Sequence, residues 1–109
     1  MVVSAGDAAR SRIDQLSESQ ALASLASLLD RSGRDAAALN AWRRVRSIGD
    51  GVLAARASYA VGAALQASGK PAEAIEAFEQ ARSAGLAHGE LALAAAAIDR
   101  LADLGVAPR

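Results

Sequence analysis

Few side chains in this 109-residue chain can carry out acid–base chemistry, and His88 is its only histidine. Enzymes most often move protons with a histidine or with carboxylates held within hydrogen-bond reach of the substrate. Asp99 and Asp103 are four residues apart, so one helix would place both carboxylates on the same face. The same spacing is typical of a solvated helix surface, and we expect that role for the pair. We expect His88, beside Gly89 and Glu90, to be an exposed loop residue, with contact to a partner protein as the alternative.

Other types of catalytic or ligand site lack the residues that they need. The chain has no cysteine, which excludes disulfide bonds, thiolate zinc sites and a thiol nucleophile. Its glycines follow predicted helices at repeated positions and have neither the spacing nor the lysine of a phosphate-binding loop. We therefore expect a protein that is not an enzyme and that holds no metal or cofactor.

The charge balance argues against nucleic acid as a partner. Lys and Arg together number 12, as do Asp and Glu, so the formal net charge is zero, whereas a protein that grips a phosphate backbone needs an excess of basic residues. The one cluster of like charge is formed by Arg43, Arg44 and Arg46. We expect these arginines to lie on a solvated helix face, with contact to an anionic partner as the alternative.

Neither a secretory signal nor a membrane span is predicted. Residues 1–6 carry no charged side chain and are followed at once by Asp7 and Arg10, whereas a signal peptide has a basic start and an apolar run of about 7 to 15 residues. The longest uncharged stretch in the C-terminal part covers residues 91–98, far shorter than the roughly 20 residues that cross a bilayer. We expect a cytoplasmic protein that does not associate with membranes.

The elements that position these residues are predicted to be helices. Hydrophobic residues make up 52% of the chain but aromatic residues only 3%, and 30 residues are alanine. Alanine is the best helix former and offers little surface for a thick core. This composition predicts narrow helices that pack closely, with almost no strand. At 109 residues the chain has room for one domain.

The sequence contains an internal repeat of 36 residues. Gly33, Gly69 and Gly105 lie 36 residues apart, and residues 19–54 align with residues 55–90 at ten identical positions. The alignment places Trp42 on Phe78, so we expect Trp42 in the core rather than as a platform for an aromatic ligand. The chain is therefore predicted to contain two copies of one structural unit.

Each unit is predicted to contain two amphipathic helices. Apolar residues recur at three- and four-residue steps, which predicts helices near residues 18–32, 35–48, 54–68, 71–84 and 90–104. Ser17 and Gln20 form a capping-box pattern that would start the first helix, and Gly33 is suited to end it. Pro71 fits the first turn of a helix because its missing N–H is not needed there. Residues 1–16 are expected to form either a short helix or a loose tail.

A helix-turn-helix unit with small residues at fixed positions and one aromatic residue in its second helix resembles the tetratricopeptide repeat (TPR) family. In the second unit the residues that carry the resemblance are Gly62, Leu65, Gly69, Ala74, Phe78 and Ala81. Their counterparts in the first unit are Ala26, Leu29, Gly33, Ala38, Trp42 and Val45. We expect Gly62 and Ala74 to let the two helices of a unit touch, and Phe78 to fill the space beyond.

The chain departs from the family pattern at several positions. Leu22 and Ser58 stand where the family has a tryptophan, and Asp50 and Leu86 stand where it has a proline. The 36-residue period is longer than the family's usual 34 residues. We expect the two extra residues in the loops between units, at 49–52 and 85–89.

The resemblance implies an all-α fold, a right-handed stack of tandem helix-turn-helix repeats that forms a TPR-like α-solenoid. Two full repeats, about 19–54 and 55–90, and a capping helix at about 90–104 would form a TPR-like domain over residues 17–109. The resemblance also implies a non-enzymatic module for protein–protein interaction, which binds a peptide or a partner helix in a concave groove. Chaperone-binding members hold a terminal carboxylate with lysine and asparagine in this groove, and neither occurs here, so we do not expect that activity.

The family's groove is lined by the first helix of each unit, which also places the Arg43 to Arg46 cluster on the convex outside. The groove positions hold Gln20, Ala23, Ser27 and Asp30, then Arg56, Tyr59, Ala63 and Gln66, then Ala92, Ala95, Asp99 and Ala102. Tyr59 and Arg56 are types favoured at interfaces, one as a rigid amphipathic ring and the other as a forked donor. The predicted partner-binding residues are Gln20, Ser27, Asp30, Arg56, Tyr59, Ala63, Gln66 and Asp99. The alternative is that this groove is ordinary surface.

The alternative function is that of a structural element that self-associates, or packs within a larger protein, through its C-terminal helix. Residues 91–98 hold no polar side chain over two turns, whereas the cap of a repeat stack carries a polar outer face. This pattern predicts a homodimer, or docking onto a neighbouring segment, through Leu93, Ala96 and Ala97 with the tip near Arg100. The competing hypothesis is that alanine is present there only for its helix propensity.

Overall fold

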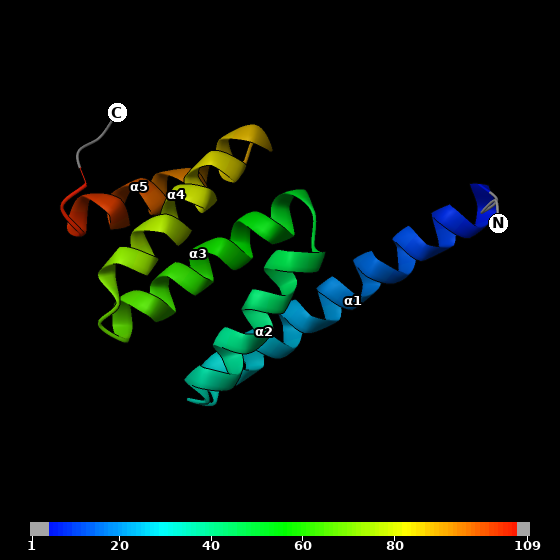
Figure 1. The fold of residues 1–109 in the computed structure, drawn as a ribbon, viewed down its shortest axis with the longest axis horizontal. Coiled ribbons are helices and arrows are strands. Elements are labelled where there is room, and N and C mark those ends of the chain that lie inside the picture. The colour runs from blue at the N-terminus through cyan, green and yellow to red at the C-terminus, as the bar shows by residue number, and fades with distance from the viewer. Residues whose placement is uncertain (1–4, 107–109) are drawn as a thin grey trace.

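The computed structural model describes the backbone of residues 5–106 and, within that range, every side chain except those of residues 5, 7–9, 15 and 16. Over this range the chain forms five α-helices and no strand, as predicted (Figure 1). The helices are α1 (Ala5–Arg31), α2 (Asp35–Ile48), α3 (Gly51–Ala67), α4 (Pro71–Ala87) and α5 (Leu91–Asp103). The all-helical fold class is therefore confirmed.

Each helix packs against the next one along the chain, so the five helices form a row of hairpins. α3 also contacts both α1 and α5, whereas α2 and α4 do not contact each other within the described range. The odd-numbered helices therefore form one side of the row and the even-numbered helices the other. The molecule measures 50 × 34 × 24 Å. The right-handed solenoid that the family resemblance implies stays a prediction.

α1 is longer than predicted. It runs unbroken for 27 residues from Ala5, through the pattern at Ser17 and Gln20 that we expected to start it. That prediction was wrong because the residues before Ser17 favour a helix as well as those after it, so the pattern does not mark a boundary. Residues 5–16, for which we expected either a short helix or a loose tail, belong to α1, and residues 1–4 lie outside the described range.

The N-terminal half of α1 extends past its neighbour, because α2 has only 14 residues (Figure 1). The guanidinium of Arg12, on this half, donates to the carboxylate of Asp50 at 2.8 Å, in the turn between α2 and α3. Both side chains are more than half exposed, so this ion pair contributes little to the free energy of unfolding. Its effect is to tie the extension of α1 to the turn.

The turn inside each hairpin has the same geometry. Gly33 and Gly69 have φ of 78° and 74°, in the left-handed region that glycine adopts without strain. The residue after each glycine donates its N–H to a carbonyl five residues back, Arg34 to Leu29 at 2.9 Å and Lys70 to Leu65 at 2.9 Å. The prediction that these glycines end helices is confirmed, and the 36-residue repeat is present in the backbone as well as in the sequence.

The connections between hairpins are shorter than predicted. α3 begins at Gly51 and α4 continues to Ala87, so most of the residues that we assigned to loops at 49–52 and 85–89 are helical. Gly85 lies within α4 and is buried, since α5 passes very close to it. A Cβ at Gly85 would lie 3.1 Å from the carbonyl oxygen of Glu90 and 3.2 Å from the Cβ of Ala94. This glycine therefore serves helix packing and does not end the helix.

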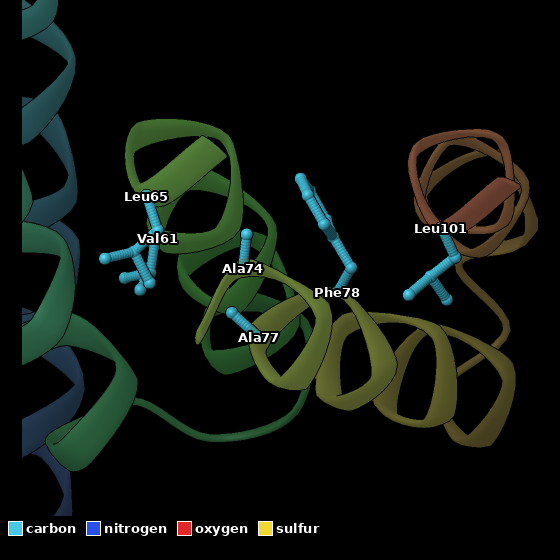
Figure 2. Close-up of a cluster of buried hydrophobic side chains, with 6 residues drawn as sticks. All are labelled: Val61, Leu65, Ala74, Ala77, Phe78 and Leu101. Atoms are coloured by element: carbon cyan, nitrogen blue, oxygen red, sulfur yellow. The ribbon is translucent and has the colours of Figure 1, made fainter. Parts of the chain in front are cut away.

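The core lies between α3 and α4 and is closed on the other side by α5 (Figure 2). Phe78 is fully buried at its centre, and Ala74 is fully buried on the same helix. A Cβ at Gly62 would lie 2.8 Å from the Phe78 ring, so α3 and α4 approach this closely only because position 62 has no side chain. The predicted roles of Gly62 and Phe78 are confirmed. The remaining members of this cluster are Val61, Leu65, Ala77 and Leu101.

Candidate functional site

A cavity of about 720 Å³ lies between the α1–α2 turn and the C-terminal half of α3. Helix α1 contributes Asp30 near its C-terminus, α2 contributes its first turns, and α3 contributes a run of small residues. The cavity is mainly apolar because half of its lining residues are alanine and Leu39 adds a further apolar side chain. The lining residues are Asp30, Asp35, Ala36, Leu39, Tyr59, Ala60, Ala63, Ala64, Ala67 and Ser68.

The charged groups of the cavity are both acidic. Asp30 and Asp35 are exposed, and none of the residues that line the cavity is basic. The indole N–H of Trp42 donates to the carboxylate of Asp30 at 3.0 Å, which fixes the position of that carboxylate. The cavity therefore combines an apolar wall with two carboxylates that have no cationic side chain among the lining residues.

Tyr59 forms part of the cavity wall, and contacts with other side chains fix the position of its ring. Its ring meets the ring of Phe78 edge to face, with centroids 5.4 Å apart, and it is half-buried. On the side of α5, the guanidinium carbon of Arg100 lies 5.6 Å from the Tyr59 centroid and 5.8 Å from the Phe78 centroid. Arg100 also donates to the side-chain oxygen of Gln66 at 2.9 Å. These contacts make Tyr59 a rigid part of the cavity wall.

The contacts of Arg100 predict a measurable effect on stability. Arg100→Met is expected to lower the free energy of unfolding by about 1 to 2 kcal/mol, because it removes a half-buried hydrogen bond and two cation–π contacts. Urea denaturation followed by circular dichroism measures this change. The matched control is Arg56→Met, at an exposed arginine of α3. Equal losses in the two variants would contradict the stabilising role of these contacts.

The structure brings together three of the predicted partner-binding residues, Asp30, Tyr59 and Ala63, in the wall of the cavity. The other five do not line it. Gln66 binds Arg100. Arg56 and Asp99 are exposed on α3 and α5. Gln20 and Ser27 belong to α1, exposed and half-buried respectively.

Sequence reasoning missed the contribution of α2 to the site. Asp35, Ala36 and Leu39 line the cavity, but the family resemblance assigns the groove to the first helix of each unit alone. The signal that could have found them is their spacing, which places all three on one face at the start of α2. Sequence reasoning also missed Ala60, Ala64 and Ala67, which lie beside the predicted groove positions of α3.

The predicted self-association residues are not on an exposed face. Ala97 is fully buried, Leu93 and Ala96 are half-buried, and Arg100 is turned toward Tyr59 and Gln66. The assignment stays a prediction, but the burial of Ala97 and the contacts of Arg100 argue against it, since a helix made mostly of alanine does not show from its sequence which side packs inward. The buried stripe of α5 is Ala94, Ala97 and Leu101, and the exposed stripe is Leu91, Ala95, Ile98 and Ala102.

The remaining candidates are mostly surface residues, as expected. His88, Asp99 and Asp103 are exposed, and so are Arg43 and Arg44, whereas Arg46 is half-buried. Arg44 forms an ion pair with Glu18 at 3.5 Å, between two exposed side chains.

Trp42 differs from the expectation of a core residue. It packs against the buried cluster but is only half-buried, and its N–H reaches the surface at Asp30.

Three further observations bear on the kind of site. Among the residues that the structure describes, no group of three or more His, Asp or Glu side chains is placed to hold a metal ion. None of the helices within that part of the chain has the length and hydropathy needed to span a bilayer. Comparison with protein-family models, with curated proteins and with solved structures finds no match to this chain.

Proposed function

We propose that this chain is a non-enzymatic interaction module that binds a peptide or helix of a partner protein in the cavity between α1, α2 and α3. The observation that carries the proposal is the composition of the cavity wall, an apolar alanine surface with two acidic side chains and no basic one. A cavity of about 720 Å³ falls within the usual range for specific ligand sites. It is large enough to hold one or two side chains of a partner.

The charge of the cavity favours a basic partner segment. A lysine or arginine would pair with Asp30 and Asp35, while a small apolar neighbour would cover the alanines of α3. The ring of Tyr59 adds an aromatic surface of the type enriched at interfaces. We therefore propose a segment in which a basic residue stands next to small apolar residues.

The rigidity of the wall supports binding of a short segment. Trp42 holds Asp30, while Phe78 and Arg100 hold Tyr59, so little conformational entropy remains to be lost from the receptor on binding. A small contact area then suffices for useful affinity.

Peptide selection followed by measurement of affinity tests this proposal. Selection from a random peptide library against the full chain is expected to enrich segments with lysine or arginine beside alanine, valine or leucine. The dissociation constant of a selected peptide is expected to rise at least tenfold in the double variant Asp30→Asn, Asp35→Asn, about 1.4 kcal/mol of binding free energy. Isothermal titration calorimetry gives both values.

The matched control is the double variant Asp99→Asn, Asp103→Asn, which removes the same charge from exposed residues of α5. It is expected to leave the dissociation constant unchanged. A second variant, Ala63→Phe, fills the cavity without changing the charge and is expected to abolish binding. Selected peptides that bind the Asp30→Asn, Asp35→Asn variant and the Ala63→Phe variant as tightly as they bind the unmodified chain would contradict the assignment of this cavity.

A further inference from the structure

The outer face of α5 is apolar and has no partner within the described chain. Leu91 is 66% exposed and Ile98 40% exposed, although both are large hydrophobic residues. Ala95 and Ala102 are exposed on the same stripe, at alternating steps of four, three and four residues. The opposite face of α5 is already buried against the rest of the chain. α5 is therefore apolar on two sides, and only one of them is covered.

The repeat indicates what kind of element covers such a face. The 36-residue repeat aligns Leu91 and Ile98 with two residues of α3 and with two residues of α1. These four aligned residues are all buried. One of them, Gly62, lies directly against Phe78 of α4, the helix that follows α3. α5 thus exposes the surface that, in α3, receives another helix. The related residues are Ala55 and Gly62 in α3, and Ser19 and Ala26 in α1.

The sizes of the side chains on this stripe determine which kind of helix can pack against it. In α3 the related positions are the small residues Ala55 and Gly62, and Gly62 accepts the ring of Phe78, whereas in α5 they hold leucine and isoleucine, which leave no room for such a ring. A covering helix must therefore present small residues opposite Leu91 and Ile98. The stripe of α5 alternates large and small residues, so the same stripe, reversed, supplies an alanine opposite each large side chain.

We propose that this face binds a second copy of the chain, with the two α5 helices packed antiparallel about a two-fold axis. Leu91 would lie opposite Ala102 of the other copy, and Ala95 opposite Ile98 of the other copy. The steps of four and three residues are those of a helix–helix seam, and a surface complementary to itself when reversed forms a closed dimer. This inference is independent of the cavity on the other side of α3.

The charges along the seam are compatible with a dimer of modest affinity. Asp99 would lie beside Ala92 of the other copy, so no acidic pair forms near the centre. α5 has 13 residues and is about 20 Å long, so the interface is small. A dissociation constant on the order of 10 to 100 μM is expected.

Sedimentation equilibrium of the full chain, from about 5 to 500 μM, tests association through this face. The unmodified chain is expected to pass from monomer to dimer. Ile98→Glu is expected to remain helical by circular dichroism and to raise the dissociation constant at least tenfold. The matched control is Leu28→Glu, at a leucine of α1 that is 57% exposed, and it is expected to dimerise normally. A monomeric unmodified chain, or loss of association in Leu28→Glu as in Ile98→Glu, would overturn the proposal.

Cysteine cross-linking tests the antiparallel arrangement, since the chain has no cysteine of its own. A mixture of Leu91→Cys and Ala102→Cys chains is expected to form a disulfide-linked dimer under mild oxidation. Leu91→Cys alone is expected not to, because two copies of position 91 would be about 16 Å apart along the seam, beyond the reach of a disulfide. Equal cross-linking of Leu91→Cys alone and of the mixture would overturn the antiparallel arrangement.

Discussion

Phe78→Ala is expected to lower the free energy of unfolding by about 3 to 5 kcal/mol. Phe78 is fully buried between α3, α4 and α5, and several of the residues around it are alanine or glycine. Such short side chains have no rotamers with which to reach into the space that the ring leaves. The resulting cavity therefore persists, and the loss includes both the buried apolar surface and the contacts along the cavity wall. Guanidinium denaturation followed by circular dichroism measures the change.

The control for this prediction is Glu76→Ala, two residues away on the exposed face of α4. It adds a strong helix former and removes no buried contact, so the free energy of unfolding is expected to stay within about 0.5 kcal/mol of that of the unmodified chain. Glu79 is less suitable as a control because it is half-buried. If Phe78→Ala and Glu76→Ala had the same midpoint of denaturation, Phe78 would not be at the centre of the core.

Gly62→Val is expected to lower the free energy of unfolding by about 3 kcal/mol, because a Cβ at this position meets the fully buried ring of Phe78 at 2.8 Å. Either the ring leaves its preferred rotamer or α3 moves away from α4. Thermal and chemical denaturation both report the loss. Ala67→Val, at an exposed position of the same helix, measures the cost of a β-branched residue in α3 without the clash.

A second substitution tests whether the clash with the Phe78 ring causes this loss. In a chain that already carries Phe78→Leu, the ring is absent and Gly62→Val is expected to cost at least about 1 kcal/mol less than in the unmodified chain. This double-mutant cycle isolates the contact between positions 62 and 78. Additive effects of the two substitutions would show that the contact does not limit the packing of α3 on α4.

The positions of most helices and the centre of the core follow from the sequence. The three- and four-residue periodicity of the larger apolar residues predicts that Phe78 and Leu65 face inward, and both are buried. Helix boundaries are less predictable, since they depend on competition between neighbouring segments. Ser17 has the pattern of a helix start, but α1 runs through it because nothing before it stops a helix.

The candidate site was predicted only in part, for a different physical reason. Asp30, Tyr59 and Ala63 were expected on the surface that forms the cavity. The contribution of α2, however, depends on the angle at which the first hairpin packs against α3. That angle is set by packing between hairpins and leaves no periodic trace in the sequence.

The alanines of α5 are a second case in which sequence reasoning fails. Ala94 and Ala97 are buried, whereas Ala95 and Ala102 are exposed, and the four side chains are chemically identical. Where the residues on both sides of a helix are the same, periodicity contains no information about its rotation. Only the packing of α5 against α3 and α4 distinguishes the two faces.

Within the described range, contacts in this fold join only helices that are one or two positions apart in the chain. Folding such a molecule closes only short loops, so the entropic barrier is low and the row is expected to form rapidly from whichever hairpin forms first. The same property makes the energetics nearly one-dimensional, because each hairpin is stabilised by its own helices and by its immediate neighbours. A local perturbation at one end is then expected to lower the protection from amide hydrogen exchange first in the adjacent helix and only later in helices at the far end. α3 contacts helices on both sides and is therefore expected to open last, so that the cavity and the core that it supports persist while the ends of the row fray.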